Sequence, residues 1–426
     1  MLRGDQSPRL VHLGLGSFHR SHQAWYVNSL QSSDPGWAYH SFAVNSRELV
    51  DRLSSQGGKY TLVQTVQGSE TEFTQIDSIS KCGVSSDSEE FNSALASETT
   101  SCVTLTISEG GYSDTRKDGA IGRLSSALFE RFRKSGAPLT VISCDNLPKN
   151  GSVTKNSILK ASKAFEPDFH EWFLEYVEFP NTMVDRITPN PSSSLSKMVR
   201  RETGFEDQTP VLTEKYSEWF IEGQRNDTVP PWQNVGVRYV DDVSPFENRK
   251  LWLLNGAHSL MSYLGQLRQL ENVASAMCDK QISPTVESLW EEVSSVLPGE
   301  GLEDYIASLR LRFENPHINH SLEKISQNGP SKIRTRWLPV MKKRAIELGE
   351  QSPALATAIA AWITFSTLND KKTWDEESEQ IFRDQKGITS SSIREIMRRL
   401  DQESAENDEI IESILEAQKR LNKELV

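Results

Sequence analysis

Hydrophobic residues in the first 165 positions occur in short β-branched runs separated by segments of helical period. The first run, Arg9 to Leu15, ends in glycines; a helical segment, Ser21 to Leu30, and a second apolar run, Trp37 to Val44, follow. This order of strand, glycine-rich turn, helix and strand predicts a βαβ unit and therefore a parallel sheet. Further runs over Ser101 to Ser108 and Pro138 to Ser143 predict two more strands with a helix between them.

After about position 246 the hydrophobic pattern follows the helical period alone. It predicts helices over residues 250–269, 284–296, 302–313, 333–348, 354–368, 391–403 and 408–425. We find no alternating run in this half that predicts a strand. The sequence therefore predicts an α/β domain over residues 1–244, followed by a mostly α-helical domain over residues 245–426.

Composition and charge narrow the class of protein. A chain of 426 residues is too long for one ordinary core, and its 36% hydrophobic and 25% charged residues are typical of globular proteins. The net charge of −12 argues against binding to nucleic acid or to an anionic membrane. Residues 1–9 are polar and predict no signal peptide. The longest nearly apolar run, residues 353–365, is too short to cross a bilayer and predicts a buried helix.

The four cysteines are widely scattered, and none belongs to a C-x-x-C pair. This spacing argues against a zinc site built on thiolates and against a disulfide framework. We therefore expect a reducing, cytoplasmic compartment. The sequence shows no strong self-association patch, so we also expect a monomer.

A glycine-rich turn follows the first predicted strand, where Gly14 and Gly16 precede Ser17, Phe18 and His19. Glycines let a backbone approach a dinucleotide pyrophosphate closely, and the N-terminus of the following helix offers N–H groups to the phosphates. The pattern departs from G-x-G-x-x-G because His19 stands at the third glycine. These five residues form our candidate cofactor-binding turn; the alternative is a tight strand-to-helix turn that holds no ligand.

The end of the second strand usually carries an acidic residue that binds the adenosine ribose and selects NAD. Here Asn45 takes that position, and Arg47 follows it closely. Because Arg47 can face a 2′-phosphate, Asn45 and Arg47 predict that NADP is accepted. The alternative is that Arg47 is a solvated surface residue and Glu48 binds the ribose, so the choice between NAD and NADP stays open.

One predicted helix carries Lys250, Asn255 and His258 among apolar neighbours. On an ideal α-helix Lys250 and His258 lie roughly 80° apart, so the three side chains can border one pocket. A buried lysine with a lowered pKa can take a hydroxyl proton while hydride leaves the carbon, and amides stabilise the oxygen, without any metal. On spacing alone the better interpretation is structural, with a lysine extended to water and a histidine buried in the core.

Several longer segments resemble one known family, in the same order along the chain. They are GLGSFHRSHQ (14–23), TISEGGY (106–112), SCDNLPKNG (143–151), FPNTMVDRITP (179–189), VLTEKYSEWFI (211–221) and KLWLLNGAHS (250–259). The chain resembles the polyol-specific long-chain dehydrogenases, the mannitol dehydrogenase and fructuronate reductase group. The resemblance implies a Rossmann-type dinucleotide-binding domain, then a mostly helical substrate and catalytic domain, with the active site between them.

The resemblance also implies roles for particular residues. Lys250 is expected to act as the general base, and His258 to position the substrate. Asn146 and Asn255 are expected to hold the reacting oxygen, and Asp185 resembles a ligand of a substrate hydroxyl group.

Three further charged residues have less specific matches. Glu247, shortly before the lysine, can relay protons to solvent; an equal alternative is an exposed carboxylate near a helix start. Lys324 and Lys332 stand where the family tends to place basic substrate contacts, although the first is often arginine and lysine is a poorer bidentate partner. The alternative for both is an ordinary surface lysine.

The predicted function is reversible hydride transfer between NAD or NADP and a carbon bearing a secondary hydroxyl group, with D-mannitol and D-fructose as the leading pair. Other hexitols or pentitols, a keto-uronate such as D-fructuronate, or the pair mannitol 1-phosphate and fructose 6-phosphate have the same helix motif. Two non-redox alternatives remain: a nucleotide-binding protein without catalysis, which should have lost Lys250, and a methyltransferase, which gives this helix motif no role.

Overall fold

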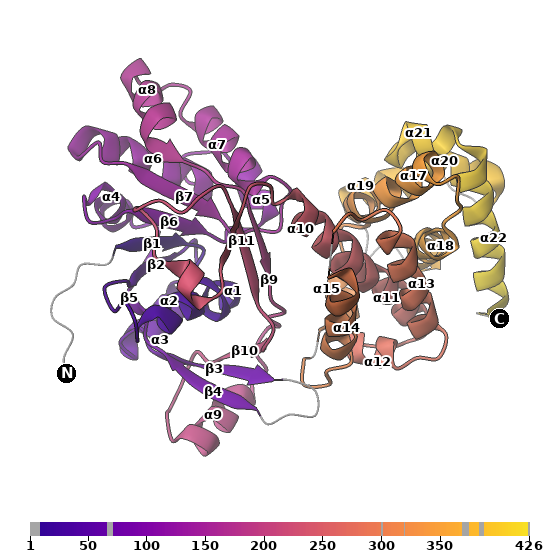
Figure 1. Ribbon diagram of the computed structural model, residues 1–426, viewed down its shortest axis with the longest axis horizontal. Coiled ribbons are helices and arrows are strands. Elements are labelled where there is room, and N and C mark those ends of the chain that lie inside the picture. The colour runs from indigo at the N-terminus through magenta and orange to yellow at the C-terminus, as the bar shows by residue number, and fades with distance from the viewer. Residues whose placement is uncertain are drawn as a thin grey trace. The chain divides into compact units, whose positions relative to one another are not determined.

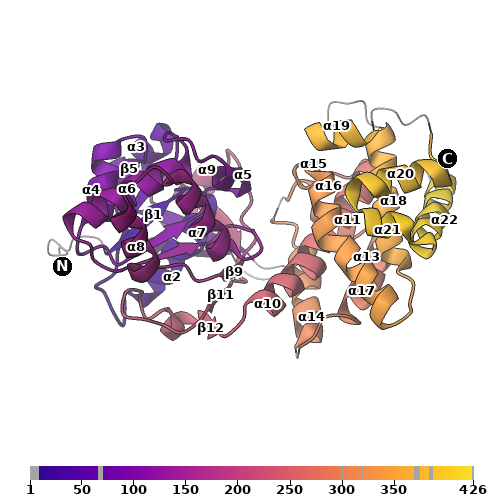
Figure 2. The ribbon, with the colours of Figure 1, turned by 90° about the horizontal axis from the view of Figure 1, so that it is seen from above.

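The computed structural model describes residues 9–65, 71–299, 301–318, 320–368, 375–382 and 387–424. The chain divides into two compact units, residues 1–244 and 245–426 (Figure 1). All strands of the described chain belong to the first unit, and the second unit is built of helices (Figures 1 and 2). This confirms the predicted fold class, an α/β domain followed by a mostly α-helical one.

A six-stranded parallel sheet forms the centre of the first unit. Its order is β5-β2-β1-β6-β7-β8. The strands are β1 (Leu10–Leu13), β2 (Tyr39–Ala43), β5 (Ile79–Val84), β6 (Cys102–Leu105), β7 (Leu139–Ser143) and β8 (Val177–Glu178). From β1 the chain adds β2 and β5 on one side and then β6, β7 and β8 on the other. In such sheets ligands bind beyond the carboxyl ends of the strands, at the reversal of strand order.

Helices cover both faces of this sheet, because successive side chains of a strand point to opposite faces. Leu10 packs with α2 and α3 on one face, whereas Val11 and Leu13 pack with α4, α6, α7 and α8 on the other. The helices of this unit are α1 (Ser17–Ser21), α2 (Gln23–Leu30), α3 (Arg47–Ser55), α4 (Ser88–Ala96), α5 (Glu109–Ser113), α6 (Ala120–Lys134), α7 (Asn150–Ala161), α8 (Pro167–Tyr176) and α9 (Leu195–Thr203). The helix predicted over 21–30 begins already at Ser17 and is interrupted at His22.

Two smaller mixed sheets, which the sequence pattern did not predict, complete the first unit. The first has the order β10-β3-β4 and the second β12-β11-β9. Their strands are β3 (Tyr60–Thr65), β4 (Glu72–Ile76), β9 (Thr182–Asp185), β10 (Val211–Glu214), β11 (Glu218–Glu222) and β12 (Arg238–Val240). The short 3-10 helix η1 (Trp232–Val235) packs Trp232 against Trp219 of β11, with ring centroids 4.6 Å apart.

The second unit is a bundle of helices around α11 and α18. Its elements are α10 (Ser244–Arg249), α11 (Gly256–Leu267), α12 (Val273–Met277), α13 (Ile282–Ser294), α14 (Leu302–Phe313), α15 (Leu322–Ile325), α16 (Gly329–Lys332), α17 (Leu338–Glu347), α18 (Pro353–Leu368), α19 (Glu376–Phe382), α20 (Ser390–Leu400), α21 (Gln402–Glu406) and α22 (Asp408–Glu424). Helix α18, which packs against α11 and α22, confirms the buried helix predicted over 353–365. Residue 425, the predicted end of the last helix, lies outside the described residues.

Two of the predicted helices start with a π-helical turn instead of an α-helical one. These turns are η2 (Lys250–Asn255), which leads into α11, and η3 (Ile333–Trp337), which leads into α17. A π-turn is wider because each hydrogen bond closes onto the fifth residue, and it occurs frequently at functional sites. The angular spacing of Lys250 and His258 on an ideal α-helix, which we used for the prediction, therefore does not apply.

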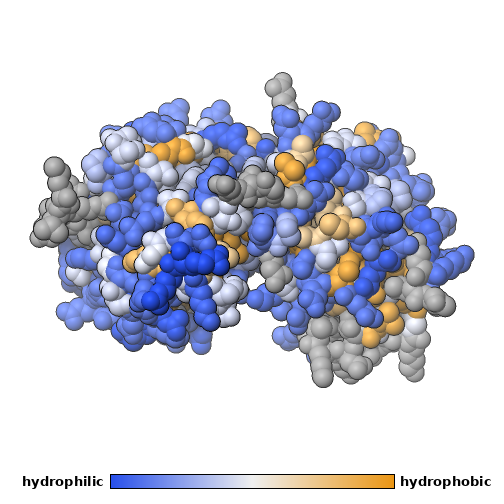
Figure 3. Space-filling model, turned by 90° about the horizontal axis from the view of Figure 1, so that it is seen from below, coloured by the Kyte–Doolittle hydropathy of each residue, from blue (hydrophilic) through white to orange (hydrophobic). Residues whose placement is uncertain are grey.

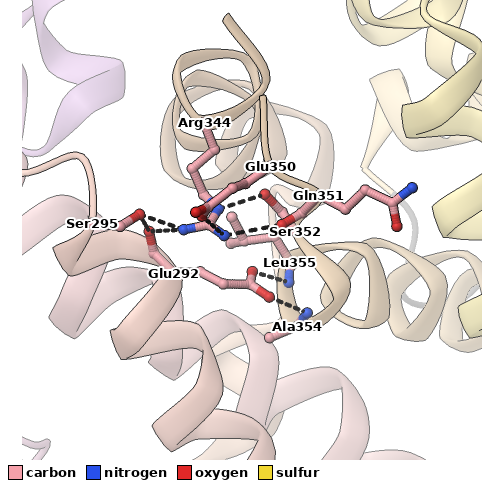
Figure 4. A network of polar contacts seen from close by, with 8 residues as sticks. All are labelled: Glu292, Ser295, Arg344, Glu350, Gln351, Ser352, Ala354 and Leu355. Carbon is pink, nitrogen blue, oxygen red and sulfur yellow. Dashed lines mark hydrogen bonds and ion pairs between the residues drawn. The ribbon is translucent and has the colours of Figure 1, made fainter. Parts of the chain in front are cut away.

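A buried polar network fixes the start of α18 (Figure 4). Glu292 of α13 accepts hydrogen bonds from the backbone N–H groups of Ala354, at 2.7 Å, and Leu355, at 3.0 Å. Arg344 of α17 donates to Ser352 Oγ, just before the helix, at 3.1 Å. The first N–H groups of a helix have no partner within the helix and favour a negative charge. The network thus joins α13, α17 and α18 without leaving these groups unpaired.

Hydrophobic side chains on the surface are scattered where they can be seen. Figure 3 shows hydrophobic residues in small groups among hydrophilic ones on the face drawn. Scattered apolar side chains of this kind are normal on a protein surface. No helix in the described ranges is long and apolar enough to cross a membrane.

Candidate active site

The glycine turn lies at the carboxyl end of β1, where the strand order reverses. Gly14 has a φ of +113°, and a Cβ atom on it would lie 2.0 Å from the carbonyl oxygen of Thr106, just after β6. Only glycine fits this backbone conformation and this close approach. Gly16 caps α1, whose first turn contains Ser17 and Phe18. The candidate cofactor turn is thus held tightly against the strand beside β1.

Two buried histidines pack beside this turn. The rings of His12 and His19 stack with centroids 3.4 Å apart. His12 is hydrogen-bonded to Thr106 Oγ1 at 2.9 Å, and that hydroxyl donates to the carbonyl of Gly14 at 2.8 Å. Burial lowers the pKa of His12 to about 3, so it is neutral at pH 7. The side chain of His19 is fully buried, and its Nε2 is hydrogen-bonded to Ser41 Oγ at 2.9 Å.

The end of β2 leaves the choice of cofactor open. Asn45 and Arg47 are both exposed, and Ser46 between them caps α3. Glu48, the alternative ribose ligand, pairs with Arg52 one helical turn later, at 2.5 Å. Exposed ion pairs are weak, so this pair does not prevent Glu48 from binding a ribose.

Two predicted site residues of the first unit come from different sheets. Asn146 is exposed just after β7, at the same edge of the main sheet as the glycine turn. Asp185 is buried at the end of β9. Asn150 joins the two segments, because its amide donates to the carbonyl oxygens of Asp145, at 3.1 Å, and Thr182, at 3.0 Å.

In the second unit, Lys250 is the first residue of the π-helical turn η2. Glu247 lies just before it on α10, and both side chains are half-buried. Turn η2 packs against the second π-helical turn, η3. Trp252 fixes this contact by donating its indole N–H to the carbonyl of Thr335 at 3.2 Å. The lysine therefore lies in a segment whose unusual backbone is fixed by tertiary contacts.

Asn255 and His258 present buried polar atoms near this turn. Asn255 is 9% exposed and His258 is 4% exposed. Arg336 of η3 donates to the carbonyl of Asn255, at 2.9 Å, and to Ser259 Oγ, at 2.7 Å. Within the described chain, neither Asn255 Nδ2 nor His258 Nε2 has a hydrogen-bond partner. Buried polar atoms rarely lack partners, so these two atoms are available for hydrogen bonds to a ligand.

His258 packs against two rings and lies near several cationic groups. Its ring centroid lies 4.5 Å from that of Phe313 and 4.8 Å from that of His320. Burial first, and then His320 and the nearby cations Arg312 and Arg336, lower the pKa of His258 well below its usual value. The imidazole is therefore neutral at pH 7 and suited to a hydrogen bond with a hydroxyl group.

The two other predicted lysines differ in their surroundings. Lys332 is half-buried and donates to the carbonyl of Ile325, whereas Lys324 is exposed on α15. Burial, with a smaller contribution from these two lysines, lowers the pKa of His320 to about 4. Sequence reasoning did not select His320 or Arg336. Arg336 stands four residues after Lys332, a spacing that places both on one face of a helix. This spacing is the signal in the sequence that could have identified Arg336.

The fold and the site together define a class of protein. A parallel sheet with a glycine turn at the reversal of strand order is typical of dinucleotide-binding enzymes. In the part of the chain that is described, no three His, Cys, Asp or Glu side chains come together to hold a metal. Residues 8–234 match the mannitol dehydrogenase Rossmann domain, and residues 242–422 match the mannitol dehydrogenase C-terminal domain. The chain belongs to the mannitol dehydrogenase family, which confirms the predicted family and the predicted class of dinucleotide-dependent dehydrogenase.

Several relatives are similar over most of their length. The chain is 30% identical to a polyol:NADP oxidoreductase of Gluconobacter oxydans, over 88% of this chain and 83% of that protein. It is 33% identical to a mannitol 2-dehydrogenase of Aspergillus clavatus, over 84% and 78% of the two chains. The structure of Pseudomonas fluorescens mannitol 2-dehydrogenase in a ternary complex with NAD and D-mannitol has a TM-score of 0.85 and 30% identity, and the match covers 99% of this chain and 93% of that one.

Proposed function

We propose that this chain transfers hydride reversibly between NAD or NADP and the C2 secondary alcohol of D-mannitol, giving D-fructose. The observation that carries the proposal is its match, over 99% of this chain, to an enzyme whose structure contains NAD and D-mannitol. Oxidation breaks one C–H and one O–H bond, and the hydride and the proton need separate acceptors. The nicotinamide ring accepts the hydride when bound, and the chain must hold the oxygen and take the proton.

Residues 1–244 hold the dinucleotide in this proposal. The pyrophosphate lies at the turn formed by residues 14–19, and Asn45 and Arg47 lie at the adenosine ribose. Support comes from Gly14, whose backbone leaves no space for a side chain, and from the place of the turn at the reversal of strand order. The exposed Arg47 and the absence of an acid at Asn45 favour acceptance of NADP beside NAD.

Lys250 takes the hydroxyl proton, and Glu247 passes it to solvent. A lysine can act as base at neutral pH when its surroundings disfavour the charged form. The half-buried position of Lys250 at the start of a π-turn supports this role. Residues 245–426 thus supply the base, and the reaction proceeds without a metal ion.

Amide groups hold the reacting oxygen, and further polar groups bind the other hydroxyls. Asn146 and Asn255 donate to the oxygen as charge develops on it. His258 and Asp185 position the hydroxyl groups farther along the substrate. The buried atoms Asn255 Nδ2 and His258 Nε2, which have no partner in the described chain, support these assignments.

One observation favours a second candidate substrate, a keto-uronate such as D-fructuronate. Arg312, Arg336 and Lys332 all act on His258 as nearby positive charges. Such a group of cations suits a substrate that carries a carboxylate. In either case Lys332 and the exposed Lys324 contact the end of the substrate away from the reacting carbon.

We further propose that the protein works as a monomer in the cytoplasm. All four cysteines are free, as is usual in a reducing compartment. Sedimentation of the purified protein tests whether it is a monomer, and a stable dimer would contradict that proposal.

A panel of polyols, ketoses and keto-uronates, assayed with NAD(H) and NADP(H) by nicotinamide absorbance, tests the function. We expect the highest kcat/KM for D-mannitol and D-fructose, with measurable rates for both cofactors. A preference for D-fructuronate would establish the second candidate. Strict dependence on NAD would contradict the role of Arg47, and no turnover with any member would contradict the proposal.

Replacing His258 with alanine is expected to raise the KM for the polyol about tenfold and to lower kcat, because one hydrogen bond to the substrate is lost. Steady-state kinetics and thermal unfolding measure the two effects separately. His317→Ala, a change of an exposed histidine in the same unit, is the matched control and should alter neither. If His258→Ala changes the melting temperature alone, the histidine is a core residue.

A further inference from the structure

Asp145 links the two loops at the carboxyl edge of the main sheet. It lies between β7 and Asn146, and its carboxylate accepts two hydrogen bonds from the loop that follows β6 and one from Tyr112 of α5. Oδ2 accepts from the backbone N–H of Ile107, at 2.9 Å, and from the hydroxyl of Tyr112, at 2.6 Å. Oδ1 accepts from the backbone N–H of Ser108 at 3.0 Å. One side chain therefore provides the hydrogen-bond acceptor for two backbone N–H groups and one hydroxyl group of the neighbouring segment.

The loop held by Asp145 contains a strained residue. Ser108 has a φ of +68°, in the left-handed region that side chains other than glycine rarely adopt. Such strain persists only where the surroundings hold it, and it occurs often at functional sites. A charged acceptor makes stronger hydrogen bonds than a neutral one. The carboxylate of Asp145 is therefore the group that keeps Ser108 in this conformation.

The backbone of Asp145 is itself fixed from the other side. Asn150 is fully buried, donates to the carbonyl of Asp145 and accepts from the N–H of Thr182 at 2.9 Å. Tyr112, which bonds to the carboxylate, is also hydrogen-bonded to Ser143 at the end of β7, at 2.7 Å. Asp145 therefore joins rigid parts of the molecule, and moving its carboxylate would shift both loops.

We propose that Asp145 is a positioning residue for the reaction: it sets the place of Asn146 and of the loop after β6. The inference rests on the proposed function, in which Asn146 holds the reacting oxygen and the dinucleotide lies at this edge. Asp145 itself touches neither substrate nor cofactor in this role. It acts by fixing the backbone on which Asn146 is carried and the conformation of Ser108.

A double-mutant cycle tests the inference. Asp145→Asn keeps the size of the side chain but replaces one acceptor oxygen with a donor that faces an N–H group. We expect kcat for polyol oxidation to fall about 10- to 100-fold, because a small displacement of a reacting group is costly. In an Asn146→Ala background the same change should lower kcat less than about threefold, since the two residues act through one another.

Hydrogen exchange gives a second readout that does not depend on turnover. The amides of Ile107 and Ser108 should exchange about tenfold faster or more in Asp145→Asn, because the carboxylate that protects them is lost. Asp118→Asn, the same change at an exposed site of this unit, is the matched control and should alter neither exchange nor kcat. If Asp145→Asn does not fold, Tyr112→Phe removes one bond to the carboxylate and should show a smaller loss of kcat that also depends on Asn146.

Equal losses of kcat in the presence and absence of Asn146 would overturn the inference, as would unchanged exchange at Ile107 and Ser108. If the unaltered protein oxidises no polyol, the proposed function fails while the exchange experiment still decides whether Asp145 fixes the loop. The two failures are therefore distinguishable.

Discussion

Replacing Lys250 with alanine is expected to lower kcat by about 10²- to 10⁴-fold, the contribution typical of a general base. The hydroxyl proton then has no acceptor when hydride leaves, so the chemical step slows while binding is retained. The affinity for NADH, measured by fluorescence titration, should stay close to that of the unaltered protein, because the proposed dinucleotide contacts are all in residues 1–244. In the alanine variant, kcat should no longer show the change with pH that arises from deprotonation of Lys250.

Two comparisons make this result specific to Lys250. Lys419→Ala changes an exposed lysine of α22 in the same unit and should leave kcat unchanged. Small primary amines added to Lys250→Ala should restore part of the rate, because they can accept the proton in place of the missing side chain. Full turnover in Lys250→Ala would refute its assignment as the base.

Replacing Gly14 with alanine is expected to destabilise the first unit by about 2–5 kcal/mol, the combined cost of backbone strain and overpacking. The added Cβ would lie 2.0 Å from the carbonyl oxygen and 2.5 Å from the carbonyl carbon of Thr106, and neither backbone atom can yield like a flexible side chain. The turn must open or the strands must separate. Thermal or urea unfolding measures the loss, and NADH affinity should fall with it.

The other glycine of the turn provides the contrast. A Cβ on Gly16 would meet no atom closer than 3.5 Å, so Gly16→Ala should retain the stability of the unit. The same methyl group would stand where the pyrophosphate is proposed to approach, so the affinity for NADH should still fall. Gly36→Ala, at a site before β2 where an added Cβ would meet no atom closer than 3.5 Å, should change neither quantity. A stable Gly14→Ala variant would contradict the account of the turn.

Many elements of the fold follow from local patterns in the sequence. The apolar runs that form β1, β2, β6 and β7 and the helical periods of the second half were readable because each pattern reflects burial on a known period. The glycine turn could be predicted for another local reason: Gly14 must adopt a backbone conformation that a side chain would prevent. The motif KLWLLNGAHS by itself shows that Lys250, Asn255 and His258 belong to one segment.

The features that the sequence did not predict depend on contacts between segments that lie far apart along the chain. Strand β3 pairs with the distant β10, and β9 with β11, so these two pairings have no local signal in the sequence, whereas β3 and β4 are neighbours along the chain. The π-turns η2 and η3 pack against each other although they lie far apart in the sequence, and propensity alone favours an α-helix at both places.

The sequence by itself determined which residues are candidates for the chemistry, because the motif KLWLLNGAHS places a lysine, an amide and a histidine among apolar neighbours and resembles the motif of a known family. Only the tertiary structure decided how they are held. The neutral state of His258 follows from burial and from cations on other helices. The place of Asn146 follows from Asp145 and from a loop that precedes it by two helices and a strand. Electrostatic fields and hydrogen bonds act through space, and the order of residues along the chain does not record those distances.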